Sequence, residues 1–449
     1  QKEVTRMRKF SYISVLMLVF MVVASQTGWA DDATLDTGDN AWILTCSALV
    51  LLMTPGLAFF YGGMCSVKNL NNMIMMVFLC MAIISVQWVF WGYALSFGAD
   101  HGSFIGGLGM AGLHGITPDS LSGTLSEYTF VAFQATFAII TVGLIMGAVE
   151  GRMRFSACML FIPLWATACY DPVCHWVWGG GWAGSMGILD FAGGTVVHIN
   201  SAAAALALCL MVGKRKNSNI RPPANVPMIA LGAGLLWFGW FGFNAGSELA
   251  ADGRAAFAWV ITNTAAAAAA FTWIVCEWIH RGKPTLLGMA SGAVAGLVCI
   301  TPAAGFVGPL GAVQMGIMAG VGCYFACVKM KAAFGYDDAL DVVGVHGVGG
   351  TIGAFATGLY CTKFVMGPDG VDGFFIGWSA EGLNQLGLQV VGFAATWVYA
   401  FAVTIVICLI VKYTTGLRTT DEIEDKGLDL SLHAEAAYHL ETESTGTLK

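Results

Sequence analysis

Two histidines are the side chains whose type and position most clearly suggest chemistry, because each lies well inside an apolar run. His198 ends the run GGTVVH at 193–198, and His346 lies within VGVHG at 343–347. Ionisable groups inside apolar membrane segments are costly and mark functional sites by default. A neutral imidazole donates from one ring nitrogen and accepts at the other, and it titrates near neutral pH. Two such rings in contact would offer polar sites along an apolar pore and a route for a proton.

A metal centre and a purely structural role are the competing interpretations of these histidines. A metal needs three or four ligands at suitable spacing, and the sequence places no such set around either residue. A single buried histidine is more often structural than functional, but two at matching positions favour a shared function. We therefore expect no metal and no other cofactor.

Aromatic side chains form the second group of interest. Phe133 and Phe137 are four residues apart and share a helix face, Phe243 lies in a later apolar segment, and Trp178 follows Trp176 just before a glycine run. Aromatic faces attract small cations by ~0.5–2 kcal/mol and can also close a narrow path. Packing against lipid or at the membrane interface is the alternative for any one of these rings.

Several carboxylates lie near the ends of apolar segments. Asp190 precedes the segment of the first histidine and Asp341 that of the second, so each is expected to cap a helix. Glu150 and Glu277 are expected to cap helix ends or to pair with a neighbouring arginine. Asp171 has no role assigned from the sequence. No GxSxG, P-loop or HExxH motif is present, which argues against an enzyme or an ATP-driven pump.

The composition places these residues in a membrane protein. Hydrophobic residues make up 57% of the 449 residues and charged residues 11%, against roughly 45–50% and about 25% in soluble domains. The mean hydropathy is +0.71. So few charges could not cover a soluble fold, and the same composition excludes disorder. The net charge of -7 argues against a nucleic-acid partner. The 13 cysteines lie mostly in apolar runs and are expected to pack rather than form disulfides.

The first 30 residues are predicted to be a cleaved signal peptide. Basic residues at positions 6, 8 and 9 precede an uncharged run over 10–24, and small residues follow. A retained first helix is the alternative, but the run is short for a span, which needs ~20 residues.

Eleven further apolar segments have spanning length. They cover 41–62, 72–95, 127–149, 155–174, 194–213, 226–246, 257–279, 285–302, 306–328, 341–361 and 389–412. Fifteen Lys and Arg residues follow odd-numbered segments, whereas only Arg254 and Lys363 follow even-numbered ones. Because basic residues stay on the cytoplasmic side, the mature N-terminus is expected outside and the tail inside.

The segments also predict an inverted internal repeat. The run FFYGG at 59–63 in the first segment is similar to WFGFNAG at 240–246 in the sixth, and the histidines lie in the fifth and tenth. A repeat of five spans inserts its second copy upside down, which is the plan of many transporters with a site at mid-membrane. The fold class predicted is therefore all-α and polytopic, with an inverted 5+5 repeat and a final helix.

Three of these stretches resemble the ammonium transporter (Amt/MEP/Rh) family, specifically its bacterial Amt branch. They are DFAGGTVVH at 190–198, WFGFNAGS at 240–247 and DVVGVHG at 341–347, and the resemblance extends over about 40–438. It implies the ammonium-transporter fold, with eleven helices and a pore in each subunit of a homotrimer. It also implies a multi-pass location in the bacterial inner membrane. Asp171 and Cys174 depart from the apolar or small residues usual at their positions, which leaves the form of the outer vestibule open.

The resemblance further implies roles for the residues named above. Trp178 and Ser247, with Phe133 and Phe137 alongside, would recruit ammonium at the outer side. Phe137 and Phe243 would form a gate of stacked phenyl rings.

Behind this gate, His198 and His346 would be the twin pore histidines, which also relay protons. Asp190 would support the outer site without lining the pore. The expected domains are the signal peptide (1–30), the transporter domain (31–412) and a cytoplasmic regulatory tail (413–449). This tail would meet a PII-type signalling protein.

The function predicted from all of this is ammonium transport. The cation would be recruited outside and deprotonated, ammonia would pass the histidines, and the proton would travel separately. An ammonium sensor that acts through the tail and a partner, and an Rh-like neutral gas channel, are the alternatives. The expected partners are ammonium or ammonia, membrane lipid and the other subunits of the trimer.

Overall fold

The computed structural model describes residues 34–216 and 222–438. The predicted signal peptide and the last part of the predicted tail lie outside the described residues. The α-helices are α2 (Thr37–Met64), α3 (Leu70–Gln87), α4 (Tyr93–Phe97), α5 (Glu127–Met146), α6 (Phe155–Trp165), α7 (Asp171–Trp178), α8 (Trp182–Ser185), α9 (Asn200–Val212), α10 (Val226–Ala245), α11 (Gly253–Arg281), α12 (Leu286–Ile300), α13 (Pro309–Phe325), α14 (Lys331–Phe334), α15 (Val348–Tyr360), α16 (Lys363–Met366), α17 (Phe374–Gly377), α18 (Ala380–Thr414) and α19 (Asp421–Lys426).

Short π-helical turns join several of these helices into longer stretches. They are η2 (Trp88–Gly92), η5 (Ala166–Tyr170), η6 (Gly194–Ile199), η8 (Ala326–Met330) and η9 (Val343–Gly347), and a further one, η10 (Asp429–His433), lies in the tail. The described strands are four pairs of residues in one loop, β1 (Asp100–His101), β2 (Ile105–Gly106), β3 (Leu121–Ser122) and β4 (Leu125–Ser126). They form two small antiparallel hairpins.

Nine helical stretches of the described residues are long and apolar enough to cross a membrane. They are Thr37–Met64, Val67–Phe97, Glu127–Val149, Phe155–Ser185, Gly194–Val212, Val226–Glu248, Gly253–Arg281, Pro309–Phe334 and Ala380–Thr414. The other two predicted segments are also helical. One is the shorter α12, and the other is η9 followed by α15. The helical polytopic membrane fold predicted from the sequence is therefore confirmed.

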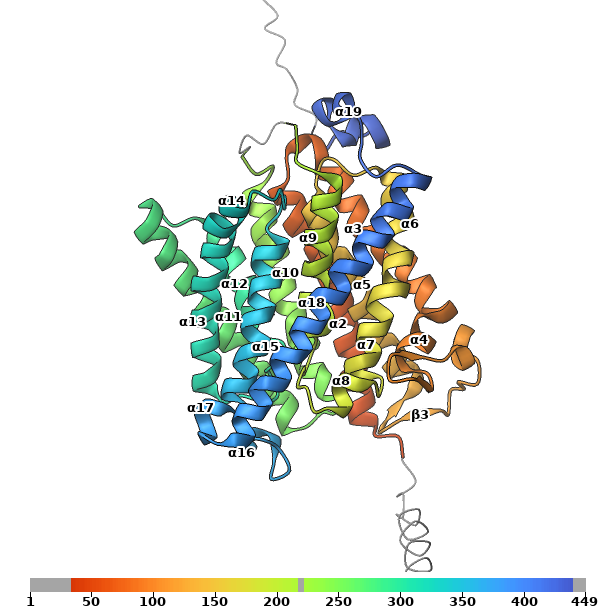
Figure 1. Ribbon diagram of the computed structural model, residues 1–449, viewed down its shortest axis with the longest axis vertical. Coiled ribbons are helices and arrows are strands. Elements are labelled where there is room, and N and C mark those ends of the chain that lie inside the picture. The colour runs from red at the N-terminus through yellow and green to blue at the C-terminus, as the bar shows by residue number, and fades with distance from the viewer. Residues whose placement is uncertain (1–33, 217–221, 439–449) are drawn as a thin grey trace, which may run out of the picture.

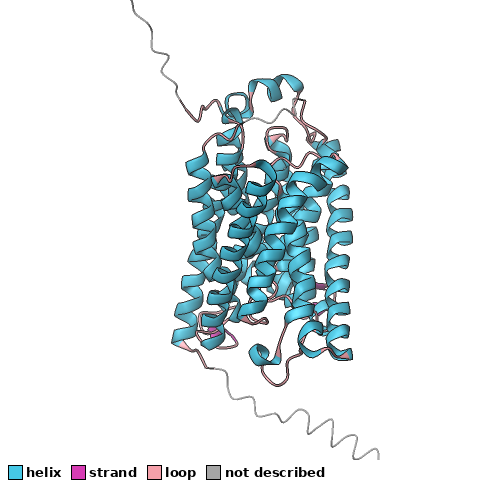
Figure 2. Cartoon of the chain, turned by 90° about the vertical axis from the view of Figure 1, so that its left-hand side faces the viewer, coloured by secondary structure: helices cyan, strands magenta, loops and turns pink. Residues whose placement is uncertain are grey.

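The helices stand side by side in one bundle (Figures 1 and 2). The short tail helix α19 lies at one end of this bundle, and the small hairpins, α16 and α17 lie at the other (Figure 1). Because the helices carry few charged residues around their circumference, their stability depends on burial against each other and on lipid.

Polar side chains fix the points at which many helices begin. Asp36, Asn225, Asp252, Thr285 and Ser379 each accept a hydrogen bond from a backbone N–H in the first turn of the helix that follows. Such caps satisfy donors that the helix itself cannot pair.

The close crossing of α2 and α10 depends on glycine. A Cβ atom added at Gly232 would lie 2.7 Å from the Cα atom of Phe60, and one added at Gly56 would lie 2.9 Å from the Cβ atom of Leu235. Small residues let two helix backbones approach closely in a membrane, where van der Waals contact drives association. These two helices carry much of the wall of the cavity described below.

All 13 cysteines are free in the structure, and 11 of them are buried. The prediction that they pack as small side chains is therefore confirmed.

Candidate functional site

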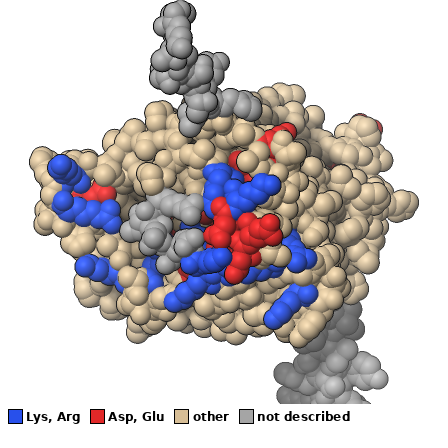
Figure 3. All heavy atoms as spheres, turned by 90° about the horizontal axis from the view of Figure 1, so that it is seen from above, with Lys and Arg blue, Asp and Glu red and all other residues tan. Residues whose placement is uncertain are grey.

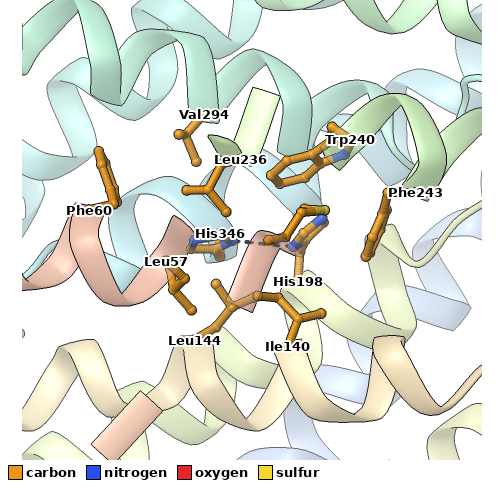
Figure 4. Close-up of a pocket in the computed structure, with 11 residues that line it drawn as sticks. Leu57, Phe60, Ile140, Leu144, His198, Leu236, Trp240, Phe243, Val294 and His346 are labelled. Atoms are coloured by element: carbon orange, nitrogen blue, oxygen red, sulfur yellow. Dashed lines mark hydrogen bonds between the residues drawn. The ribbon is translucent and has the colours of Figure 1, made fainter. Parts of the chain in front are cut away.

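A largely apolar cavity lies inside the bundle and contains both histidines (Figure 4). Its walls come from α2, α5, α10 and α12, and from the two π-helical turns η6 and η9. The residues that line it are Met53, Leu57, Phe60, Ile140, Leu144, His198, Leu236, Trp240, Phe243, Val294 and His346. The two imidazoles are thus the main polar groups of this cavity.

The structure brings the two predicted histidines into contact. Nδ1 of His346 lies 3.2 Å from Nδ1 of His198, and both side chains are buried. Such a contact needs one ring to donate and the other to accept. Nε2 of His198 is also buried and has no hydrogen-bond partner among the described residues. The pair therefore leaves a polar atom inside the bundle that a small molecule or water could use.

Stacked phenyl rings lie directly beside the histidines. The rings of Phe137 and Phe243 stack with their centroids 4.2 Å apart, and the ring of His198 lies 6.0 Å beyond Phe243. Both phenylalanines are buried. Phe133 packs edge-on against Phe137 at 4.9 Å. A molecule that follows this line of rings must displace the stacked pair.

Trp178 lies at the other side of the phenyl pair. Its ring meets that of Phe137 edge-on, with centroids 5.8 Å apart, and its Nε1–H donates to the carbonyl oxygen of Asp190 at 2.9 Å. Ser247 is half-buried, and its hydroxyl donates to the carbonyl oxygen of Phe243 at 2.8 Å. Trp178, Phe137, Phe243 and the histidines thus form a continuous column of rings.

Asp190 begins the turn that carries His198. Its carboxylate accepts hydrogen bonds from the backbone N–H groups of Gly193, Gly194, Thr195 and Val196, at 2.6–3.1 Å. These are donors that a helix start leaves unpaired. Asp190 is buried and does not line the cavity.

The counterpart of Asp190 in the second half is Asp338, which the sequence reasoning missed. Oδ2 of Asp338 accepts from the N–H of Val343 at 2.7 Å, whereas Asp341 forms an ion pair with Lys331. The expectation that Asp341 caps this turn is therefore wrong. Asp341 also has a positive φ of 61°, so it belongs to the bend before the turn. The spacing could have revealed the true cap, because each aspartate lies eight residues before its histidine.

Asp171 lies away from the cavity, at the start of α7. Its Oδ2 accepts from Nε2 of Gln87 at 2.8 Å, and its Oδ1 accepts from the hydroxyl of Ser96 at 3.5 Å. The carboxyl is fully buried, and so is the nearby Cys174. These two departures from the family pattern therefore take part in packing between α7 and the α3–α4 stretch.

Charged residues gather at the end of the bundle that carries the tail, where Lys and Arg side chains surround a group of Asp and Glu (Figure 3). Arg215 pairs with Asp337 at 2.6 Å and with Glu150 at 3.3 Å. Burial alone would raise the pKa of Asp337, but the hydrogen bonds from Arg215 and the charge of Arg152 lower it to about 2. Glu150 thus pairs with Arg215 of a distant loop rather than with its neighbour Arg152.

The described part of the tail is held against this end of the bundle. Arg418 donates from Nη1 to the carbonyl oxygen of Val212 in α9 at 3.2 Å and pairs with Glu424 of the tail at 2.6 Å. The carboxylate of Asp429 accepts from the N–H groups of Asn71 and Asn72 at 3.0 and 2.8 Å, and so caps the start of α3. The tail therefore contacts the first turn of α3 through specific hydrogen bonds.

Among the described residues, no group of three or more His, Cys, Asp or Glu side chains is arranged to hold a metal ion.

Comparisons with known proteins match this chain over most of its length. The model of the Ammonium Transporter Family matches residues 41–438. An ammonium transporter of Bacillus subtilis (strain 168) is 51% identical over 403 residues, which cover 89% of this chain and 98% of the relative. The crystal structure of Candida albicans Mep2 matches with a TM-score of 0.80 at 36% identity, over 86% of this chain and 87% of that one. A solved protein named Sensor Amt Protein matches with a TM-score of 0.81 at 28% identity, over 88% and 98% of the two chains. The chain therefore belongs to the ammonium transporter family.

Proposed function

We propose that this chain carries ammonium across the bacterial inner membrane. The cation is recruited at the outer end and deprotonated, ammonia passes His198 and His346, and the proton travels separately. The observation that carries this proposal is the column of rings that ends at two joined imidazoles inside an apolar cavity. The family is one of transporters and not of enzymes.

Selectivity explains why such a column suits ammonium. Ammonium and potassium are similar in size and charge, and a site built from carbonyl oxygens would pass both. An apolar cavity carries no bare cation, because removing its hydration shell costs many kcal/mol. Ammonium alone can leave its proton behind and continue as neutral ammonia. A cavity lined by leucine, phenylalanine and two imidazoles fits that requirement.

The outer residues serve recruitment and gating in this proposal. Trp178 and Ser247 gather the cation, with Phe133 and Phe137 beside them, because aromatic faces attract small cations. Phe137 and Phe243 form the gate, since their stacked rings separate Trp178 from the histidines. Asp190 supports this end of the pore through its four backbone hydrogen bonds.

The histidines provide the test. We expect His198→Ala and His346→Ala either to slow ammonium flux in proteoliposomes by about tenfold or more, which is ~1.4 kcal/mol in barrier height, or to let potassium pass. Net charge movement should accompany ammonium in the unchanged protein, because the proton also crosses.

His114→Ala is the matched control, because His114 is an exposed histidine of the loop that carries the hairpins. Flux and selectivity that stay unchanged in both pore variants would refute the histidine mechanism. Flux without charge movement in the unchanged protein would instead favour a neutral gas channel.

The proposal extends to the architecture. The two predicted segments that are shorter than the nine long stretches complete an inverted 5+5 repeat with a final helix. The basic residues near the tail place that end in the cytoplasm. Residues 1–30 act as a cleaved signal peptide, 31–412 form the transporter domain, and the chain assembles as a homotrimer. The tail over 413–449 meets a PII-type protein.

An ammonium sensor is the second candidate, and the likeness to Sensor Amt Protein favours it. The contacts of Asp429 with α3 offer a route by which the tail could follow the state of the bundle. A sensor that does not transport would bind ammonium without flux in proteoliposomes, so the experiment above separates the two functions.

A further inference from the structure

His175 lies one helical turn before Trp178 on α7, and its side chain is fully buried. Its Nδ1 lies 3.0 Å from the carbonyl oxygen of Ser96, and its Nε2 lies 2.9 Å from Oδ1 of Asp100. Both ring nitrogens thus face oxygen acceptors. A neutral imidazole has a single N–H, so it can donate to only one of them. The ring donates to both when each nitrogen carries a proton.

Asp100 does not supply the missing proton. The hydrogen bonds that its carboxylate accepts from His175 and from the N–H of Ser103 lower the pKa of Asp100 below its ordinary value. The carboxyl is therefore ionised at neutral pH and acts as an acceptor. The geometry is that of an imidazolium held between a carbonyl oxygen and a carboxylate.

The backbone of His175 is tied to the turn that follows it. Its carbonyl oxygen accepts from the N–H groups of Gly179 and Gly181, at 3.0 and 2.9 Å. A Cβ atom added at Gly179 would lie 2.6 Å from Nδ1 of His175, so this turn wraps closely around the ring. Trp178 lies within the turn. Its position therefore depends on how the imidazole is anchored to Ser96 in α4 and Asp100 in β1.

Among the described residues, the other titratable groups near the ring make no hydrogen bond to its nitrogens. On the same helix, Asp171 accepts from Gln87 and Ser96, and in β1 the charge of His101 acts on Asp100. Cys174 lies next to His175 in α7 itself. The elements packed against α7 carry five further titratable side chains. The five are Tyr93, bonded to Glu127, Cys169, bonded to Asn200, Tyr170, packed on Trp88, Tyr399, bonded to the carbonyl oxygen of Ala168, and His198, bonded to His346. Asp100 is thus the carboxylate bonded directly to the ring.

We propose that His175, held as an imidazolium between Ser96 and Asp100, is a positioning residue that fixes Trp178 for ammonium recruitment. The inference rests on the proposed role of Trp178. Loss of the carboxylate removes the charge-assisted hydrogen bond that anchors Nε2, and an amide at position 100 offers the ring only a weaker neutral one. The turn with Trp178 then loosens, and the affinity for ammonium falls, whereas the column behind the phenyl gate is unaffected.

Asp100→Asn tests the effect on transport. Since one charge-assisted hydrogen bond is lost, we expect the KM for ammonium in proteoliposomes at neutral pH to rise by about three- to tenfold. The maximal rate should stay within about twofold. Asp100→Glu should restore much of the affinity. Asp119→Asn, which neutralises an exposed carboxylate of the same loop, is the matched control.

Rescue by the conservative variant separates a carboxylate anchor from a purely structural contact, because Asp100→Glu keeps the charge-assisted hydrogen bond and Asp100→Asn does not. An unchanged KM in Asp100→Asn would overturn the proposal, and so would equal KM values in Asp100→Glu and Asp100→Asn.

The protonation state of His175 can be measured independently of transport. Nitrogen NMR of the full chain in bilayers, with histidine labelled and the resonance assigned through His175→Gln, should show both ring nitrogens protonated at neutral pH. A neutral ring would overturn the proposal.

Trp178→Leu distinguishes failure of this inference from failure of the proposed recruitment. If Trp178→Leu leaves the KM for ammonium unchanged, the recruitment role of Trp178 is refuted. The positioning role of His175 is then refuted as well. If Trp178→Leu raises the KM, Asp100→Asn should add nothing in that background. Additive effects would show that Asp100 acts elsewhere and would overturn the proposal.

Discussion

At the scale of single residues, Asp190 and Asp338 occupy equivalent positions but have different surroundings. Asp190 receives four backbone N–H bonds. Oδ2 of Asp338 accepts from Val343, but its Oδ1 is buried without a partner among the described residues. Burial, together with the charge of Asp341, raises the pKa of Asp338 to about 6, although the Lys331 ammonium opposes this shift. Asp338 can therefore take up a proton near pH 6.

We predict that Asp338 binds a proton as the pH falls through about 6. Its pKa in the folded protein exceeds the ordinary value of 3.8, so the folded state binds the proton more tightly than the unfolded chain. The stability of the protein should therefore rise as the pH falls from about 6 toward 3.8, and Asp338→Asn should remove this gain. Infrared spectroscopy of the carboxyl band and thermal unfolding at several pH values measure the two effects. A carboxyl band that titrates near 4 in the unchanged protein, or the same slope in Asp338→Asn, would contradict the prediction.

Some contacts of single residues could be predicted from the sequence and others could not. The contact between His198 and His346 was expected from their matching places in the predicted repeat. The partners of Asp171 did not follow, because Gln87 is 84 residues away and only the packing of two helices brings them together. His175 was missed for the same reason, since its acceptors lie on another helix and a strand.

At the scale of elements, apolar runs predicted the helices well, whereas their ends and internal turns were set by contacts. The run over 41–62 becomes Thr37–Met64 because Asp36 caps it earlier. The run over 389–412 becomes Ala380–Thr414 because the first turns of that helix contain glycine and glutamine and lie outside the apolar window. The π-helical turns at both histidines leave no trace in apolar periodicity, and such turns are frequent at functional sites.

The crossing of α2 and α10 yields a prediction with an internal control. Gly232→Ala places a methyl group against the backbone of Phe60, so overpacking should destabilise the protein by ~1–3 kcal/mol. Gly234→Ala, two residues along the same helix, meets no heavy atom within 4 Å. It should be neutral or stabilising by up to ~1 kcal/mol, because alanine favours helix. Thermal unfolding in detergent measures both, and equal melting temperatures would contradict the close packing.

At the scale of the whole molecule, charge is concentrated at one end of the bundle. Arg215 and Lys216 of the loop after α9 pair with Asp337 in the loop before η9 and with Asp425 in the tail, which joins the three segments into one network. The opposite end carries the small hairpins, with Asp119 exposed among them. Composition predicted a membrane protein, and the placement of Lys and Arg after odd-numbered segments predicted that basic residues gather at one end. The sequence could not predict which acidic side chain each arginine selects, because that depends on how the loops fold over each other.

The orientation can be tested with a membrane-impermeant thiol reagent. Labelling of the native cysteines should be low, since 11 of the 13 are buried. In intact cells we expect labelling of Asp119→Cys and none of Glu435→Cys, whereas permeabilised cells should label both, because both positions are exposed. The unsubstituted protein is the control. Labelling of Glu435→Cys alone in intact cells would place the tail outside and reverse the proposed topology.

The stacked rings of Phe137 and Phe243 have a consequence for the kinetics of permeation. With centroids 4.2 Å apart, the rings leave no standing opening between them. In the proposed transport route, each passage requires a rotation of these side chains, after which the rings stack again. We therefore expect molecules to cross one at a time. The transport rate should level off at high ammonium concentration and depend steeply on temperature.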